Sequence, residues 1–216
     1  MKRILLATLI CTLLLTGCTS TTQPENKPAP KPESTTAPEQ PPAIDPGPVK
    51  LSIKEAGEYY LKIVCQANRA GSAFVDARNE REAEYLNGGS PRVKALREAA
   101  AEKVRLTRQT IELIDDEYYT WPGKSREPLL LVRKSDMSYL SAYQSIMNAK
   151  TYEEAYQVTF PELPPEVESA AQEVRYQLKL DADTSKSCKG YRKDNDKIYA
   201  EMLKRNELLG KSEASE

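Results

Sequence analysis

The chain has 216 residues, with 31 lysines and arginines balanced by 32 aspartates and glutamates. Charges of both signs are interspersed, so no feature points to a nucleic-acid partner. Histidine is absent, which excludes Ser-His-Asp and Cys-His nucleophile pairs, imidazole zinc sites and the Glu-x-x-His di-iron bundle. The sequence also has no phosphate-binding glycine loop and no GxSxG motif. We therefore predict no catalytic residues, no metal, no cofactor and no enzyme activity.

Residues 1–17 have the pattern of an export signal. Lys2 and Arg3 precede an apolar run that is too short to span a bilayer. The segment Leu15-Thr16-Gly17-Cys18 is similar to the bacterial lipobox. In such signals the chain is cut before the cysteine, which carries a diacylglycerol, and the new amino terminus is acylated, with palmitate as the expected acyl group. We predict a lipoprotein held in the cell membrane, on its extracytoplasmic face, through acylated Cys18. The alternative is an ordinary signal peptide with a chance cysteine.

The next segment, residues 18–50, contains nine of the fifteen prolines and very few apolar side chains. Proline removes hydrogen-bond donors, and a chain without apolar residues has nothing to bury, so this composition predicts a disordered tether. At a polyproline rise of roughly 3.1 Å per residue, its extended limit is about 100 Å. The domain that can fold is then residues 51–216.

A long helix is predicted to begin at Ser52, because apolar residues recur there at alternating steps of four and three. It should end at Asn87-Gly88-Gly89, where glycine can adopt the left-handed conformation. The main apolar stripe is Ala56, Tyr60, Ile63, Ala67, Ala70, Phe74 and Ala77, and a second stripe is Leu61, Val64, Cys65 and Val75.

Further helices follow. Ser90-Pro91 has the pattern of a helix start, with Ser as the N-cap, and the apolar period then continues to Tyr118. A third helix is predicted from about Ser125, with an inward stripe that includes Leu129, Val132, Leu140, Tyr143 and Met147. A capping box at Thr151–Glu154 opens a short helix, and the last two helices span Val167–Leu178 and Tyr191–Leu209. No segment alternates as a strand should. The sequence predicts an all-α, antiparallel bundle of about four to five helices.

Two cysteines remain in the folded part once Cys11 has left with the signal and Cys18 has received lipid. An even pair in an exported domain predicts a disulfide between Cys65 and Cys188. A loop this long gives an estimate of roughly 4–5 kcal/mol in the chain-entropy treatment, and measured values are nearer 2–4 kcal/mol. Metal ligation by two thiols without histidine is the poorer alternative.

Three segments carry a family resemblance. They are Glu55-Ala-Gly-x-Tyr-Tyr-Leu-x-x-Val-Cys65-x-x-Asn68, Trp121-Pro122, and the stretch from Gln172 through Arg175 and Asp183 to Cys188. Together they resemble a group of actinobacterial cell-envelope lipoproteins to which no activity is assigned, and the similarity covers most of residues 52–192. Gln66 departs from the family, which has proline after the first cysteine. The resemblance implies placement on the outer face of the plasma membrane and pairing of the two cysteines.

Several polar groups are candidate sites. Asp181, Asp183 and Ser185 fall at the first, third and fifth positions of a calcium loop, but Lys186 and Arg192 replace its glycine and its bidentate glutamate. Helix capping is therefore the preferred interpretation. The acidic runs 115–117 and 194–196 could supply paired carboxylates for acid/base chemistry, but solvated faces are the preferred interpretation.

Tyrosine is unusually frequent, with twelve Tyr against two Phe. Most tyrosines lie on apolar stripes, which predicts core packing, and the remainder could form a binding patch with Trp121. Arg175 lies beside an inward stripe. We expect it to bond loop carbonyls near the Asp183–Cys188 turn, although it could instead grip a ligand carboxylate.

Two functions fit these features. The first is a structural or interaction module of the cell envelope that meets an envelope protein or a wall polymer. The alternative is a small-ligand-binding lipoprotein that serves a transporter or a sensor. An exposed apolar or tyrosine patch would favour the first, and an enclosed pocket with convergent polar groups would favour the second.

Overall fold

The computed structural model of the protein describes residues 47–210, so the predicted signal, Cys18 and most of the predicted tether lie outside the described part. The prediction of an all-α bundle is confirmed: residues 47–210 contain eight helices and one pair of two-residue strands. The helices are α1 (Ile53–Leu86), α2 (Lys94–Asp115), α3 (Gly123–Asn148), α4 (Tyr152–Tyr156), α5 (Pro165–Glu168), α6 (Ala170–Gln177), α7 (Thr184–Ser187) and α8 (Asp194–Leu208). The strands are β1 (Val49–Lys50) and β2 (Tyr119–Thr120).

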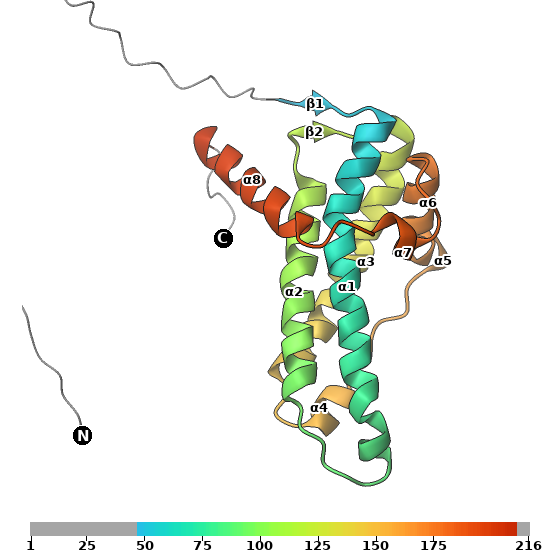
Figure 1. The fold of residues 1–216 in the computed structure, drawn as a ribbon, viewed down its shortest axis with the longest axis vertical. Coiled ribbons are helices and arrows are strands. Elements are labelled where there is room, and N and C mark those ends of the chain that lie inside the picture. Colours follow the sequence, from blue (N-terminus) through green and yellow to red (C-terminus); the bar gives the residue numbers. More distant parts are fainter. Residues whose placement is uncertain (1–46, 211–216) are drawn as a thin grey trace, which may run out of the picture. The chain divides into compact units, whose positions relative to one another are not determined.

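Three long helices, α1 to α3, form the framework and alternate in direction along one axis (Figure 1). The first begins as predicted: the Ser52 hydroxyl accepts from the Glu55 amide, and the Glu55 carboxylate accepts from the Ser52 amide. It also ends as predicted. Gly88 has a φ of 80°, and the amides of Gly88 and Gly89 donate to the carbonyls of Tyr85 and Glu84. This is the hydrogen-bond pattern that terminates a helix at a left-handed glycine.

The predicted start of the second helix is wrong. Helix α2 begins at Lys94 with Val93 as its N-cap and no capping side chain, because Ser90 and Pro91 belong to the connection and Pro91 is buried there. The helix also ends earlier than predicted, at Asp115. The chain after it forms β2, which pairs in parallel with β1, although no strand was predicted. A two-residue ladder is too short to produce an alternating pattern.

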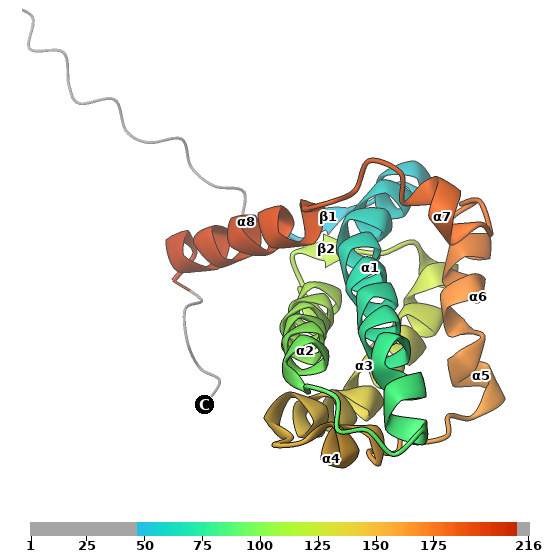
Figure 2. The ribbon, with the colours of Figure 1, turned by 60° about the horizontal axis from the view of Figure 1, so that its bottom comes forward.

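The predicted helix over Val167–Leu178 is two helices, α5 and α6, separated at Ser169. The Ser169 hydroxyl donates to the Pro165 carbonyl at 2.9 Å, a bond that competes with the regular helical pattern. Figure 2 shows α5, α6 and α7 following one another along one side of the bundle. The last helix begins at Asp194, three residues later than predicted.

Two apolar clusters lie at different levels of the framework. The first, nearer β1 and β2, contains Ala56, Tyr60, Leu61, Ile63, Val64, Cys65, Leu113, Ile114, Trp121, Leu129, Val174, Leu178, Ile198 and Met202. The second, nearer α4, contains Phe74, Leu96, Ala100, Ile146, Ala149, Tyr152 and Ala155. Val75, placed on the second apolar stripe, is half exposed and belongs to neither cluster. Within residues 47–210, no helix is both long enough and apolar enough to cross a bilayer.

Candidate functional site

A polar cavity of about 200 Å³ lies inside the bundle, bordered by α1, α2, α3 and the α5–α6 side. Along α1 to α3 it falls between the two apolar clusters, at the level of Ala67. Its polar lining side chains are Tyr60, Asn68, Lys103, Thr110, Ser135, Asp136, Glu168, Gln172, Arg175 and Thr184. The cavity is partly open, since its lining residues Asn68, Glu168 and Gln172 are exposed to solvent. A concave space with convergent polar groups is typical of small-molecule sites.

Four charged side chains border this cavity: Lys103 from α2, Asp136 from α3, Glu168 from α5 and Arg175 from α6. The Lys103 ammonium donates to the Ala67 carbonyl at 3.5 Å and lies 5.8 Å from the centre of the Tyr143 ring. The Asp136 carboxylate forms no hydrogen bond and no ion pair with any residue in 47–210, Lys103 included. Lys103 therefore has a long hydrogen bond and a ring contact but no ion pair, and Asp136 has neither a hydrogen bond nor an ion pair within residues 47–210.

The cavity shifts the protonation of its own groups. Burial lowers the pKa of Lys103, and the negative charge of Asp136 acts in the opposite direction. Burial likewise raises the pKa of Asp136 to about 6, although the Lys103 charge opposes the shift. The pKa of Tyr60 is raised, also chiefly by burial. Shifts of this kind in a concave site mark groups whose charge has been removed from water, and they concentrate at functional sites.

Arg175 has the structural role that the sequence predicts. Its Nε and Nη2 donate to the Asp181 carbonyl at 2.9 and 2.7 Å, and Nη2 also donates to the Ser187 hydroxyl. The side chain is buried and borders the cavity. It therefore fastens the loop between α6 and α7 to the wall of the cavity.

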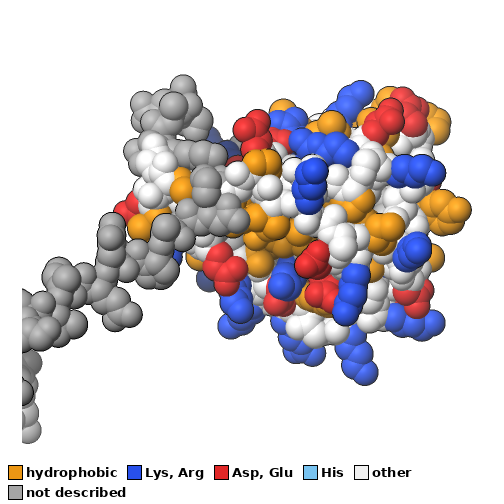
Figure 3. All heavy atoms as spheres, turned by 90° about the horizontal axis from the view of Figure 1, so that it is seen from above, with side chains coloured by type: hydrophobic (Ala, Val, Ile, Leu, Met, Phe, Trp, Pro, Cys, Tyr) orange, Lys and Arg blue, Asp and Glu red, His pale blue; other side chains and the backbone are white. Residues whose placement is uncertain are grey.

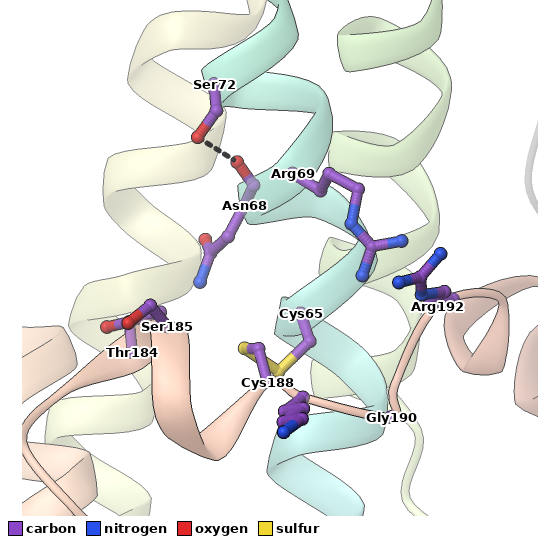
Figure 4. Close-up of a pocket in the computed structure, with 10 residues that line it drawn as sticks. Cys65, Asn68, Arg69, Ser72, Thr184, Ser185, Cys188, Gly190 and Arg192 are labelled. Atoms are coloured by element: carbon purple, nitrogen blue, oxygen red, sulfur yellow. Dashed lines mark hydrogen bonds between the residues drawn. A yellow bond between two sulfur atoms is a disulfide. The ribbon is translucent and has the colours of Figure 1, made fainter.

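The predicted disulfide is present: Cys65 of α1 is bonded to Cys188, the residue that ends α7, with their Cα atoms 5.2 Å apart. It closes a loop of 123 positions. An open groove lies directly beside it, between α1 and the chain that follows α7 (Figure 4).

Most of the acidic residues lie on solvated faces as predicted: Glu117 is exposed, and the side chains of Asp115 and Asp196 are 37% and 42% exposed. Asp116 pairs with Arg205 at 2.5 Å, and their side chains are only 5% and 12% exposed, so the prediction is wrong for this residue. Its neighbour Asp115 pairs with Arg133 at 2.5 Å in a more exposed position. An acid that already holds an arginine is not free to act as a general base.

The second acidic run is also built into the fold. Asp196 accepts from Arg105 at 2.5 Å and from the Gln66 amide at 2.6 Å. Gln66, the departure from the family pattern, thereby joins α1 to α8. Asn195 is fully buried and donates to the Ile63 carbonyl at 2.6 Å.

Asp183 and Asp181 cap local backbone structure, which is the role that the sequence favoured over calcium binding. Asp183 accepts from the backbone amides of Ser185 and Lys186 at 2.9 and 3.3 Å, and Asp181 accepts from the Asp183 amide at 2.9 Å. No cluster of three or more His, Cys, Asp or Glu suited to a metal occurs in residues 47–210.

The aromatic residues are mostly packed. Trp121 is 5% exposed and lies 5.8 Å, between ring centres, from Tyr59, so it does not contribute to an exposed patch. Tyr118 and Tyr119 lie beneath the Arg205 guanidinium at 4.0 and 5.7 Å. Tyr60 lines the cavity.

Lys103 and Asp136 were not among the candidate residues predicted from the sequence, although the sequence pattern contains a signal for both. Asp136 lies four residues after Val132 and four before Leu140, which places it on the inward stripe of the third helix. Lys103 lies three residues after Ala100, on the inward face of the second helix. A charged residue at an inward position of each of two neighbouring helices is the pattern to look for.

Comparison with known proteins finds no matching family model, no matching curated protein and no matching solved structure. The likeness to actinobacterial lipoproteins therefore stays a prediction, and the function is argued from the site.

Proposed function

We propose that this protein is an extracytoplasmic lipoprotein, anchored through Cys18, whose helical bundle binds a small zwitterionic molecule in the cavity between α1, α2, α3 and α6. The observation that carries the proposal is the pair of opposite charges, Lys103 and Asp136, that border this space and form no ion pair within residues 47–210. In this role the protein hands its ligand to a membrane transporter or reports it to a sensor.

The energetics of burial support a ligand. An ionised group withdrawn from water without a partner is costly, so buried charges in proteins are normally paired. This chain follows that rule at Asp116 and Arg205. A ligand that brings an ammonium group to Asp136 and a carboxylate to Lys103 supplies the missing partners.

The size of the cavity limits the ligand. Its volume of about 200 Å³ equals that of roughly seven molecules of liquid water. A free amino acid or a short betaine matches this volume. The hydroxyls of Tyr60 and Ser135 border the same space and are available for hydrogen bonds to such a ligand.

A thermal-shift panel of free amino acids and short betaines tests the proposal. At one hundred times its Kd, a ligand stabilises the folded state by about 2.7 kcal/mol, which raises the Tm of a domain of this size by roughly 5–10 °C. Asp136→Asn and Lys103→Met should abolish the shift. The matched controls Asp76→Asn and Lys134→Met, on exposed faces of α1 and α3, should retain it. A panel without any shift, or equal shifts in all four variants, would contradict the proposal.

The interaction-module function has one specific observation in its favour. The end of α8 extends away from α1 to α3 in both ribbon views, and Leu203 and Leu208 on it are 49% and 58% exposed. Apolar side chains also gather among charges of both signs on the end of the molecule drawn in Figure 3. Cross-linking on intact cells, compared between the wild type and Leu203→Ser/Leu208→Ser, tests this second candidate. An envelope protein trapped only by the wild type would support it, and identical products would remove it.

A further inference from the structure

The groove beside the disulfide is lined by three cationic side chains, Arg69 from α1 and Lys189 and Arg192 from the chain after α7. It is open to solvent and has a volume of about 560 Å³. None of the described residues that line it is acidic. Its other polar lining groups are the hydroxyls of Ser72, Thr184 and Ser185 and the amide of Asn68.

The two arginines converge on one space. Arg69 Nη2 donates to the carbonyl of Tyr191 at 3.3 Å, which places its guanidinium next to the residue that carries the second arginine. Figure 4 shows the guanidinium groups of Arg69 and Arg192 close to each other on the same side of the disulfide. Neither they nor Lys189 form an ion pair within residues 47–210. Arg105, Arg133 and Arg205, by contrast, each hold a carboxylate.

We propose that this groove binds a phosphate monoester carried on a polyol. Two converging guanidinium groups, with a third positive charge on Lys189 in the same lining, match a phosphomonoester, which carries nearly two negative charges at neutral pH, better than they match a single carboxylate. Guanidinium groups bind phosphate oxygens through paired N–H donors. The surrounding hydroxyls and the Asn68 amide are placed to bond the hydroxyls of the polyol. This site adjoins the zwitterion cavity at Asn68 and Thr184, but its cationic groups are different, so the proposal does not rest on ligand binding in the cavity.

The disulfide holds the two walls of the groove together. Cys65 belongs to α1, one turn before Arg69, and Cys188 precedes Lys189 directly. Gly190 has a φ of 111°, and the turn it makes brings Lys189 and Arg192 to the same groove. The disulfide therefore fixes the loop after α7 against α1, together with the hydrogen bond from Arg69 to the Tyr191 carbonyl, so reduction of the disulfide should weaken phosphate binding.

Calorimetry with two probes tests the site and separates its possible sources. Glycerol 3-phosphate represents a soluble ester, and dihexanoyl phosphatidic acid represents a lipid headgroup, with dihexanoyl phosphatidylcholine as the neutral comparison. The protein is the oxidised full chain carrying Cys18→Ser, so that no acyl chain contributes. Binding of both probes points to the shared phosphate chemistry, and binding of the lipid probe alone assigns the site to a headgroup.

The variants decide whether the groove is responsible. Arg69→Gln/Arg192→Gln should weaken binding at least tenfold. The control Arg108→Gln/Lys204→Gln also removes two positive charges, but from exposed positions outside the groove, and it should leave binding unchanged. Arg192→Gln alone breaks no hydrogen bond of the structure and should weaken binding several-fold without altering Tm. Failure of both probes to bind, or equal weakening by the two double variants, would overturn the proposal.

Phosphate binding in the groove can be tested independently of ligand binding in the cavity. Asp136→Asn should bind phosphate esters as the wild type does, and the groove variants should keep the thermal shift with the zwitterionic ligand. Asn68 and Thr184 border both spaces, so they are left unchanged in these tests.

Discussion

Two sets of partly buried charges in this protein use the same chemical groups in opposite ways. At the end of α2, Asp116 accepts from Arg205 at 2.5 Å and from the Tyr118 amide at 3.1 Å, and the guanidinium lies over the Tyr118 ring. In the middle of the bundle, Asp136 and Lys103 face a cavity and do not pair with each other. The first set joins α8 to the framework, and the second is left for a ligand. A charged side chain that forms an ion pair has a structural role here, whereas one that forms none is a candidate for ligand binding, even where the two are similarly buried.

The largest expected effect comes from breaking the structural pair. Arg205→Met leaves Asp116 buried without its partner, and removing one member of a buried ion pair typically costs about 3–5 kcal/mol. Asp136→Asn removes a charge that has no partner, so it should not destabilise the protein. Urea denaturation of both variants measures the difference. Equal destabilisation by the two changes would remove the distinction between the sets.

The second effect concerns the disulfide, which ties α1 to the loop that precedes α8. Cys65→Ala/Cys188→Ala should lower the free energy of unfolding by about 2–4 kcal/mol, because the unfolded chain loses its cross-link. The wild type with a reductant should match this variant, and the variant itself should not respond to the reductant. A stability that is unchanged by reduction would show that the bond does not constrain the unfolded chain.

The third effect is a pH dependence of opposite sign at the two kinds of acid. Because burial raises the pKa of Asp136 to about 6 from an ordinary value of 3.8, the folded protein binds more protons than the unfolded chain between these values. The contribution of Asp136 to the free energy of unfolding therefore falls as pH rises from 4 to 6, by about 1–3 kcal/mol in total. Asp196 behaves in the opposite way: although burial acts to raise its pKa, the hydrogen bonds from Arg105 and Gln66 lower it. Its contribution is lost as pH falls below 4.

Stability curves of the wild type and Asp136→Asn from pH 4 to 8 check the sign. The variant should gain on the wild type as pH rises through this range, and the two curves should be parallel above pH 7. Parallel curves throughout would mean that Asp136 has an ordinary pKa and is not withdrawn from water.

The smallest effect sharpens the comparison within one acidic run. Asp115 pairs with Arg133 at 2.5 Å, but these side chains are 37% and 32% exposed. Exposed ion pairs contribute at most about 1 kcal/mol, so Asp115→Asn should cost less than that. Denaturation in 0.5 M salt provides the control, since screening should reduce this cost further. If Asp115→Asn lowered the free energy of unfolding as much as Arg205→Met does, the stability contributed by these ion pairs would not depend on their exposure to solvent.

The sequence predicted the parts of the fold that depend on local signals. Ser52 and Gly88 marked the two ends of α1 correctly because capping and left-handed glycine are local effects. Arg175 was assigned to its loop, and Cys65 to Cys188, because few partners were available to them. The β1–β2 ladder was missed because it depends on pairing between distant segments. The break at Ser169 was missed although its hydrogen bond to the Pro165 carbonyl is local, because the apolar spacing continues through it.

The candidate site was harder to predict than the fold. Lys103 and Asp136 lie at inward positions of two helices. Opposite charges at such positions can form an ion pair or can face a ligand site, and the sequence does not tell which. The cationic groove unites α1 with residues more than a hundred positions later through the disulfide. Side-chain pairing across helices is a property of the folded chain, and spacing along the sequence does not determine it.

The most direct test of the central claim is the affinity of the amino-acid-type ligand at pH 7.5 and pH 5.0, measured by calorimetry on the wild type and Asp136→Asn. The charges of such a ligand do not change over this range, whereas only about one in ten Asp136 carboxylates is ionised one unit below its pKa of about 6. We predict that the wild type binds about tenfold more weakly at pH 5.0, and that Asp136→Asn binds weakly at both pH values without this dependence. Equal affinities for the two proteins at both pH values would contradict the assignment of Asp136 to a ligand site.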